Sequence, residues 1–67
     1  MADLLTGNLP PVPLKDQIAC VERELRLRRQ VYPRQVKNQF MTQARCDEEI
    51  RKMEAVLATL RSLERSP

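Results

Sequence analysis

The chain contains no histidine, no tryptophan and a single glycine among its 67 residues. Without histidine it lacks the side chain that most often serves as a general base near neutral pH and as a metal ligand. One glycine is too few for a glycine-rich loop that cradles a phosphate. A chain this short also encloses no deep pocket of its own. These absences predict a protein that is not an enzyme, has no small-molecule substrate and binds no cofactor.

Aromatic residues and cysteines are also scarce. Tyr32 and Phe40 are the only aromatic residues, which is too few for the base-stacking surface typical of single-strand binding proteins. Cys20 and Cys46 lack zinc-ligand spacing, and we expect both to be buried, unbridged thiols.

No stretch approaches the length of an apolar membrane span, and the N-terminus does not resemble a secretion signal. We therefore expect a cytoplasmic protein without membrane contact.

Apolar residues recur at helical spacing in two long segments, which predicts an all-α fold. Residues 14–31 should form the first helix and 43–63 the second, packed as an antiparallel two-helix hairpin. This helical domain covers residues 14–64, between a flexible proline-rich arm (1–13) and a short tail (65–67). The residues expected to form the core or a dimer seam are Ile18, Val21, Leu25, Ile50, Met53, Leu57 and Leu60.

Two amphipathic helices with so few aromatic residues form a thin core when they fold alone. The simplest way to cover it is a second copy, so we expect a homodimer in the form of a four-helix bundle. A different partner protein would satisfy the same physics. A weaker apolar row, Cys20, Leu27 and Val31, lies about 120° from the main seam of the first helix. That row is either the flank of a broad core or a surface that meets another chain.

The two helices are joined by a basic stretch, residues 23–45, which we call the basic elbow. Pro33 lacks an amide hydrogen and disfavours helical geometry in the residue before it, so the first helix should end near Tyr32. Residues 33–39 should then form a short separate helical piece. Thr42 is the expected N-cap of the second helix, because its hydroxyl can accept a hydrogen bond from an amide of the next turn. Arg28 is expected to form an ion pair with an acidic residue of the run 47–49.

The basic elbow carries seven basic residues and one acidic residue, a net charge of +6 in a chain whose total is +3. The remainder of the chain therefore sums to −3, and we expect a molecule whose basic end is the elbow. An acidic patch on a target protein would suit such a surface, with Tyr32 as an aromatic anchor. The candidate binding residues are Arg26, Arg29, Tyr32, Arg34 and Lys37.

Part of the chain resembles a set of small, mostly uncharacterised proteins encoded by tailed phages and prophages. The matching residues are Val31, Tyr32, Pro33, Val36, Met41, Thr42, Asp47, Glu49, Ile50, Met53 and Ala55. Members of that set tend to carry a tryptophan where Gln35 stands, a glycine where Gln39 stands and an alanine where Cys46 stands. The resemblance implies a phage or prophage origin, a bacterial host cytoplasm and a helical fold. It implies no established activity.

Three functions remain open at this point. The first is a small phage or prophage interaction protein that binds and modulates a host or phage protein through the elbow or through the apolar N-terminal arm. The second is non-specific nucleic-acid binding, in which the same basic residues neutralise phosphates, although no docking motif is present and the second helix begins with acidic residues. The third is a structural subunit of a larger assembly, in which the hairpin adds a layer to a bundle.

Overall fold

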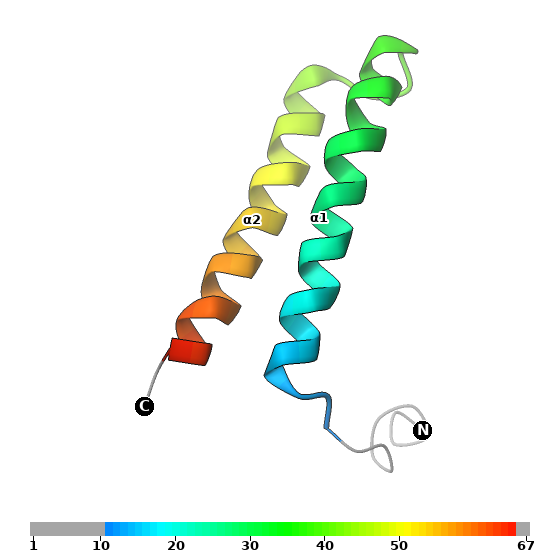
Figure 1. Cartoon of the computed structure of the whole chain (residues 1–67). Coiled ribbons are helices and arrows are strands. Elements are labelled where there is room, and N and C mark those ends of the chain that lie inside the picture. Colours follow the sequence, from blue (N-terminus) through cyan, green and yellow to red (C-terminus); the bar gives the residue numbers. More distant parts are fainter. Residues whose placement is uncertain (1–10, 66–67) are drawn as a thin grey trace, which may run out of the picture.

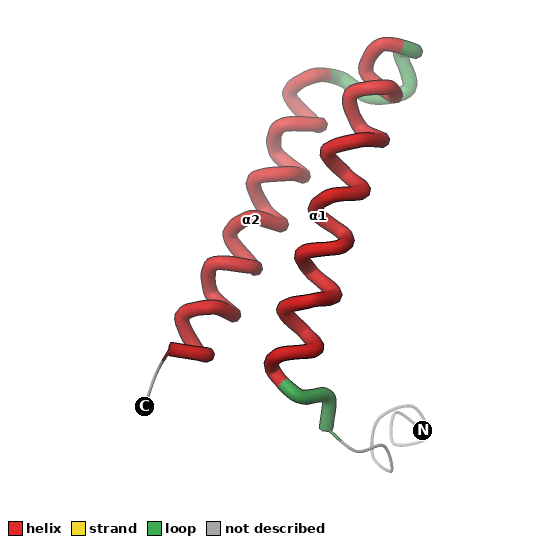
Figure 2. The backbone as a smooth tube through the Cα atoms, in the orientation of Figure 1, coloured by secondary structure: helices red, strands yellow, loops and turns green. Residues whose placement is uncertain are grey.

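A computed structural model describes residues 11–65, which form two helices joined by a tight turn (Figures 1 and 2). Helix α1 spans Leu14–Lys37 and helix α2 spans Gln43–Arg65. They run antiparallel and side by side, so the start of α1 and the end of α2 lie together, opposite the turn (Figure 1). The described residues include no strand, and the predicted all-α hairpin is confirmed. Most of the predicted arm and tail lies outside these residues.

The core is one apolar seam between the two helices. Ile18, Leu25 and Leu57 are its buried members, with 7%, 4% and 7% of their surface exposed. The partly buried residues packed against them are Leu14, Val21, Ile50, Met53 and Leu60. The seam residues named from the spacing are thus placed between α1 and α2, where they hold the two helices of a single chain together.

The two cysteines lie in different environments. Cys46 is buried in the first turns of α2 with 2% of its surface exposed, whereas Cys20 is exposed on α1. The prediction of a buried thiol is therefore wrong for Cys20. Its position lies about 120° around α1 from the seam, and a single neighbouring helix covers only the seam itself. Both thiols are free, as expected.

Helix α1 does not end at Tyr32, and the predicted separate helical piece does not form. The helix continues through Pro33 to Lys37. Proline removes one backbone donor from the helix, a local cost. Tyr32 and Val36 are half-buried on the face of α1 that is turned toward α2, while Pro33 itself is exposed. The helix therefore tolerates the one backbone hydrogen bond that Pro33 cannot make.

The end of α1 is a Schellman turn centred on Gln39, whose φ of 66° lies in the left-handed region. The Gln39 amide donates to the carbonyl of Val36 at 3.1 Å, and the Phe40 amide donates to that of Gln35 at 2.8 Å. A residue with a Cβ atom adopts this φ at a cost of roughly 1–2 kcal/mol, which glycine avoids.

The start of α2 is fixed by Thr42, as predicted. Its Oγ1 accepts a hydrogen bond from the Arg45 amide at 3.1 Å, and its carbonyl accepts one from the Cys46 amide at 3.0 Å. The helix begins at Gln43, as expected, and extends two residues beyond the predicted end. Hydrogen bonds thus fix the backbone on both sides of the turn.

Replacing Gln39 with glycine should raise the free energy of unfolding by about 0.5–1 kcal/mol. Glycine removes the steric crowding of the Cβ atom at this φ, and the greater conformational entropy of the unfolded glycine chain cancels only part of that stabilisation. Urea unfolding followed by helical circular dichroism measures the change. The matched control is Asn38→Gly, since Asn38 has a φ of −89° and offers no such relief. Equal effects of the two substitutions would contradict the left-handed conformation of Gln39.

Candidate interaction surface

The seven basic side chains of the elbow fall into two groups. Arg28, Arg29 and Arg45 form ion pairs with acidic residues of the hairpin. The others form no side-chain hydrogen bond or ion pair within residues 11–65; they are Arg23, Arg26, Arg34 and Lys37. Four positive charges of the elbow are therefore available to a partner.

Arg28 is the main polar link between the helices. Its side chain is only 19% exposed, and its Nη1 donates to the backbone carbonyl of Glu49 at 3.0 Å and lies 3.7 Å from the Glu49 carboxylate. Its Nε donates to Glu24 at 3.0 Å, and its guanidinium lies 5.7 Å from the centre of the Tyr32 ring. The expected ion pair across the joint is confirmed. Tyr32, named above as a possible anchor, is a half-buried partner of Arg28.

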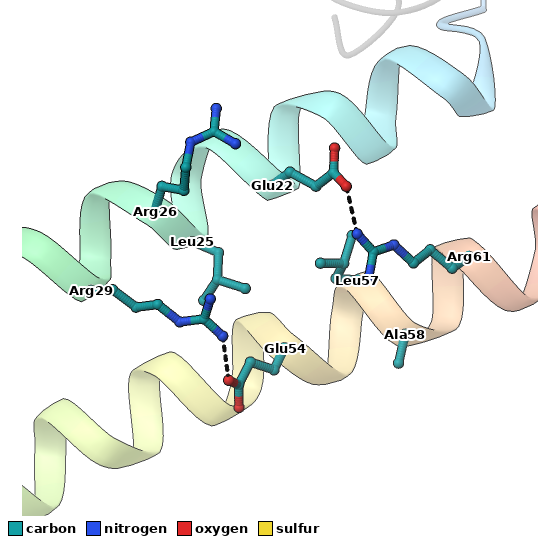
Figure 3. A pocket seen from close by; sticks show the side chains of 8 residues that line it. All are labelled: Glu22, Leu25, Arg26, Arg29, Glu54, Leu57, Ala58 and Arg61. Atoms are coloured by element: carbon teal, nitrogen blue, oxygen red, sulfur yellow. Dashed lines mark hydrogen bonds and ion pairs between the residues drawn. The ribbon is translucent and has the colours of Figure 1, made fainter.

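Two ion pairs cross one side of the hairpin and cover the seam there (Figure 3). Arg29 of α1 donates to Glu54 of α2 at 2.6 Å, and Arg61 of α2 donates to Glu22 of α1. Figure 3 shows Arg26 pointing away from both pairs. Arg29 therefore stabilises the hairpin through its ion pair with Glu54, whereas Arg26 has no such partner within residues 11–65.

The unpaired basic residues lie along one exposed stripe of α1. At about 100° per residue they fall within about 80° of one another, on the face turned away from the seam. All four are exposed. Arg34 and Lys37 belong to the last turn of the helix, where the C-terminal end of the helix dipole favours positive charge. The stripe therefore ends at the turn, with these two residues at its tip.

The basic end of the molecule is the turn end, but the polarity is weaker than the elbow's composition predicts. Residues 26–54, the half nearest the turn, carry eight basic and four acidic side chains, a net charge of +4. Residues 11–25 and 55–65, which form the open half, carry four of each. The acidic start of α2 lies beside the elbow and offsets part of its charge. Arg45 of the elbow pairs with Glu49 in this way. On α2 itself, hydrogen bonds to Glu48 and Glu49 raise the pKa of Lys52.

Phe40 is a candidate that the sequence reasoning missed. Its ring is 82% exposed, although an apolar residue at this position of a Schellman turn usually packs back on the helix. It adjoins a shallow depression lined by Val36, Met41, Thr42 and other turn residues. The signal that could have identified it is its place directly after a predicted helix end. We define the turn-end surface as Phe40, Arg34 and Lys37.

Within the described residues there is no group of three or more side chains suited to a metal ion, and neither helix is long and apolar enough to cross a bilayer. No protein-family model matches the chain, and no curated protein or solved structure is significantly similar to it. The chemistry of its own surface is therefore the basis for a functional proposal.

Replacing Arg28 with methionine should lower the free energy of unfolding by about 1–2 kcal/mol, because a charged hydrogen bond between the helices and the contact with Tyr32 are lost. Urea unfolding provides the measurement. Arg29→Met is the matched control, since the Arg29–Glu54 pair is about half exposed at both ends. An exposed pair contributes about 0–1 kcal/mol, so a loss in the control as large as that for Arg28 would contradict the role assigned to Arg28.

Proposed function

We propose that this protein is a small phage or prophage interaction protein that binds a host or phage protein through its turn-end surface. The observation that carries the proposal is the exposed ring of Phe40 in the turn that follows α1, whose last turn carries Arg34 and Lys37 without an ion pair within residues 11–65. Leaving a phenylalanine side chain in water forgoes about 1.5–3 kcal/mol of hydrophobic stabilisation, and the hairpin itself gains nothing from this exposure. A partner that buries the ring recovers that free energy.

The surface chemistry defines the kind of partner. Phe40 fits an apolar pocket, and Arg34 and Lys37 suit acidic side chains around its rim. Aromatic and arginine side chains commonly provide most of the free energy of a protein interface, while rim charges mainly speed association. Of the other candidate residues, Arg26 extends the basic stripe along α1. Tyr32 and Arg29 act within the hairpin, so the proposal gives the role of aromatic anchor to Phe40.

The geometry of the turn favours tight binding. Phe40 is held between the Schellman hydrogen bonds at the end of α1 and the Thr42 cap at the start of α2. A backbone that is fixed before binding loses little conformational entropy when the partner docks. The resemblance to tailed-phage proteins supports a phage origin, and the left-handed φ of Gln39 accounts for the glycine that those proteins tend to carry at this position.

A second candidate function is non-specific binding to nucleic acid. The observation in its favour is the stripe that runs from Arg23 to Lys37, which extends about 21 Å along α1 at 1.5 Å per residue. Charges spaced along such a stripe can neutralise successive phosphates, and the affinity would then fall steeply with salt concentration. This candidate needs only the charges, whereas protein binding also needs the ring of Phe40.

Phe40→Ala should weaken capture of the partner at least about tenfold, because burial of a phenylalanine ring is worth more than 1.4 kcal/mol. The measurement is a tagged pull-down from bacterial lysate treated with nuclease, read by mass spectrometry. The unfolding free energy should stay unchanged, since the ring is exposed in the hairpin. A dominant protein captured equally well by Phe40→Ala would contradict the proposal.

Two further variants separate the alternatives. Leu27→Ala is the matched control, because Leu27 is another exposed apolar residue, 49% exposed and distant from the turn. It should not alter capture. Arg34→Glu with Lys37→Glu should weaken both kinds of binding. The nucleic-acid function would be favoured by a different pattern. Proteins would then be captured from untreated lysate by the wild type and by Phe40→Ala, but not by the charge variant, and nuclease treatment would abolish their capture.

A further inference from the structure

A second apolar surface lies on the flank of the seam opposite the ion pairs of Figure 3. We call it the valine groove and define it by Val12, Cys20, Val21, Val56 and Leu60. Val12 and Val56 are 59% and 44% exposed. No ion pair within residues 11–65 involves a lining residue of this groove. One flank of the core is thus covered by charged pairs and the other is open.

One polar side chain at the edge of the groove already has a hydrogen-bond partner within the chain. The groove is bordered by Asp16 and Gln17, and the Gln17 side-chain amide donates to the Val12 carbonyl at 2.9 Å. The open half of the hairpin, where the groove lies, carries equal numbers of basic and acidic residues. An occupant of this groove therefore needs to be apolar and close to neutral, unlike the acidic partner proposed for the turn end.

We propose that a second copy of this chain occupies the valine groove and that the two hairpins pack antiparallel through their open halves. A hairpin of two helices buries little apolar surface, and small domains of this size are usually completed by a further element or another chain. A two-fold axis through the groove places the same residues on both sides, so each copy supplies the apolar, neutral surface that the other requires. The product is a four-helix bundle over the open halves.

The charge distribution selects the antiparallel orientation. The turn half of each hairpin carries a net charge of +4, and the open half carries none. A parallel dimer would hold two turn halves of +4 side by side, and like charges at such distances repel. An antiparallel dimer joined at the open halves directs the two turn ends away from each other. It also leaves both copies of Phe40 accessible.

The oligomeric state tests the surface. Sedimentation equilibrium of the full chain should give twice the chain mass of 7.8 kDa. Val56→Asp should weaken the dimer at least about 100-fold, because the two-fold axis introduces two buried carboxylates. The matched control is Leu27→Asp, which alters a similarly exposed apolar residue, 49% against 44%, that follows Cys20 by two turns of α1 and does not line the groove.

The control should remain dimeric. A monomeric wild-type chain would overturn the proposal and assign the groove to another occupant, and a dimeric Val56→Asp variant would overturn this choice of surface. Phe40→Ala should remain dimeric in the same measurement. Failure of the dimer and failure of turn-end binding are therefore distinguishable.

The orientation is tested with a spin label at the turn. Asn38→Cys in a Cys20→Ala background provides one reactive thiol, because Cys46 is only 2% exposed. Since Cys20 lines the groove, sedimentation equilibrium first verifies that this background is still dimeric. Helix α1 is about 36 Å long, so an antiparallel dimer joined at its open halves should separate the two labels by more than about 40 Å. A parallel bundle would hold them within about 25 Å. A pulsed electron resonance distance in the shorter range would overturn the antiparallel arrangement.

Discussion

The structure depends on a single apolar seam, because two helices can meet only along one line. Ile18, Leu25 and Leu57 are the buried members of that line. With so narrow a core, the two flanks of the seam determine what each side of the hairpin can do. Ion pairs between the helices cover one flank, and the valine groove leaves the other apolar. The charged flank completes the hairpin, whereas the apolar flank is suited to another chain.

The basic residues of the elbow have two roles, and the distance of each residue from the seam determines which role it has. Arginines near the seam are within reach of acids on α2, so Arg28 and Arg29 stabilise the hairpin. The basic residues of the outer stripe lie about half a turn away and form no ion pair within residues 11–65. Fewer basic side chains are therefore open to a partner than the charge count of the elbow suggests. The proposed binding surface lies at the turn, where Phe40 follows the last turn of α1 with Arg34 and Lys37.

Periodicity and capping chemistry predicted the hairpin, the start of both helices and the Thr42 cap, because these depend on local spacing and hydrogen bonding. Three features depended on more than local spacing and were missed. The helix passes Pro33, with Tyr32 and Val36 half-buried on either side of it. Cys20 is exposed because only one helix covers α1. The exposure of Phe40 follows from the turn geometry, which residue type alone does not determine.

The two proposed surfaces reinforce each other. An antiparallel dimer carries its turn ends at opposite ends, so each dimer presents two copies of Phe40 with their basic neighbours, facing apart. If both proposals hold, such a dimer would bind two partner molecules or two sites on one oligomeric partner. When both sites engage one target, the second contact forms at a high effective concentration, and the avidity can exceed the single-site affinity by about 10²–10⁴. A weak contact at each small turn end is then enough for stable association.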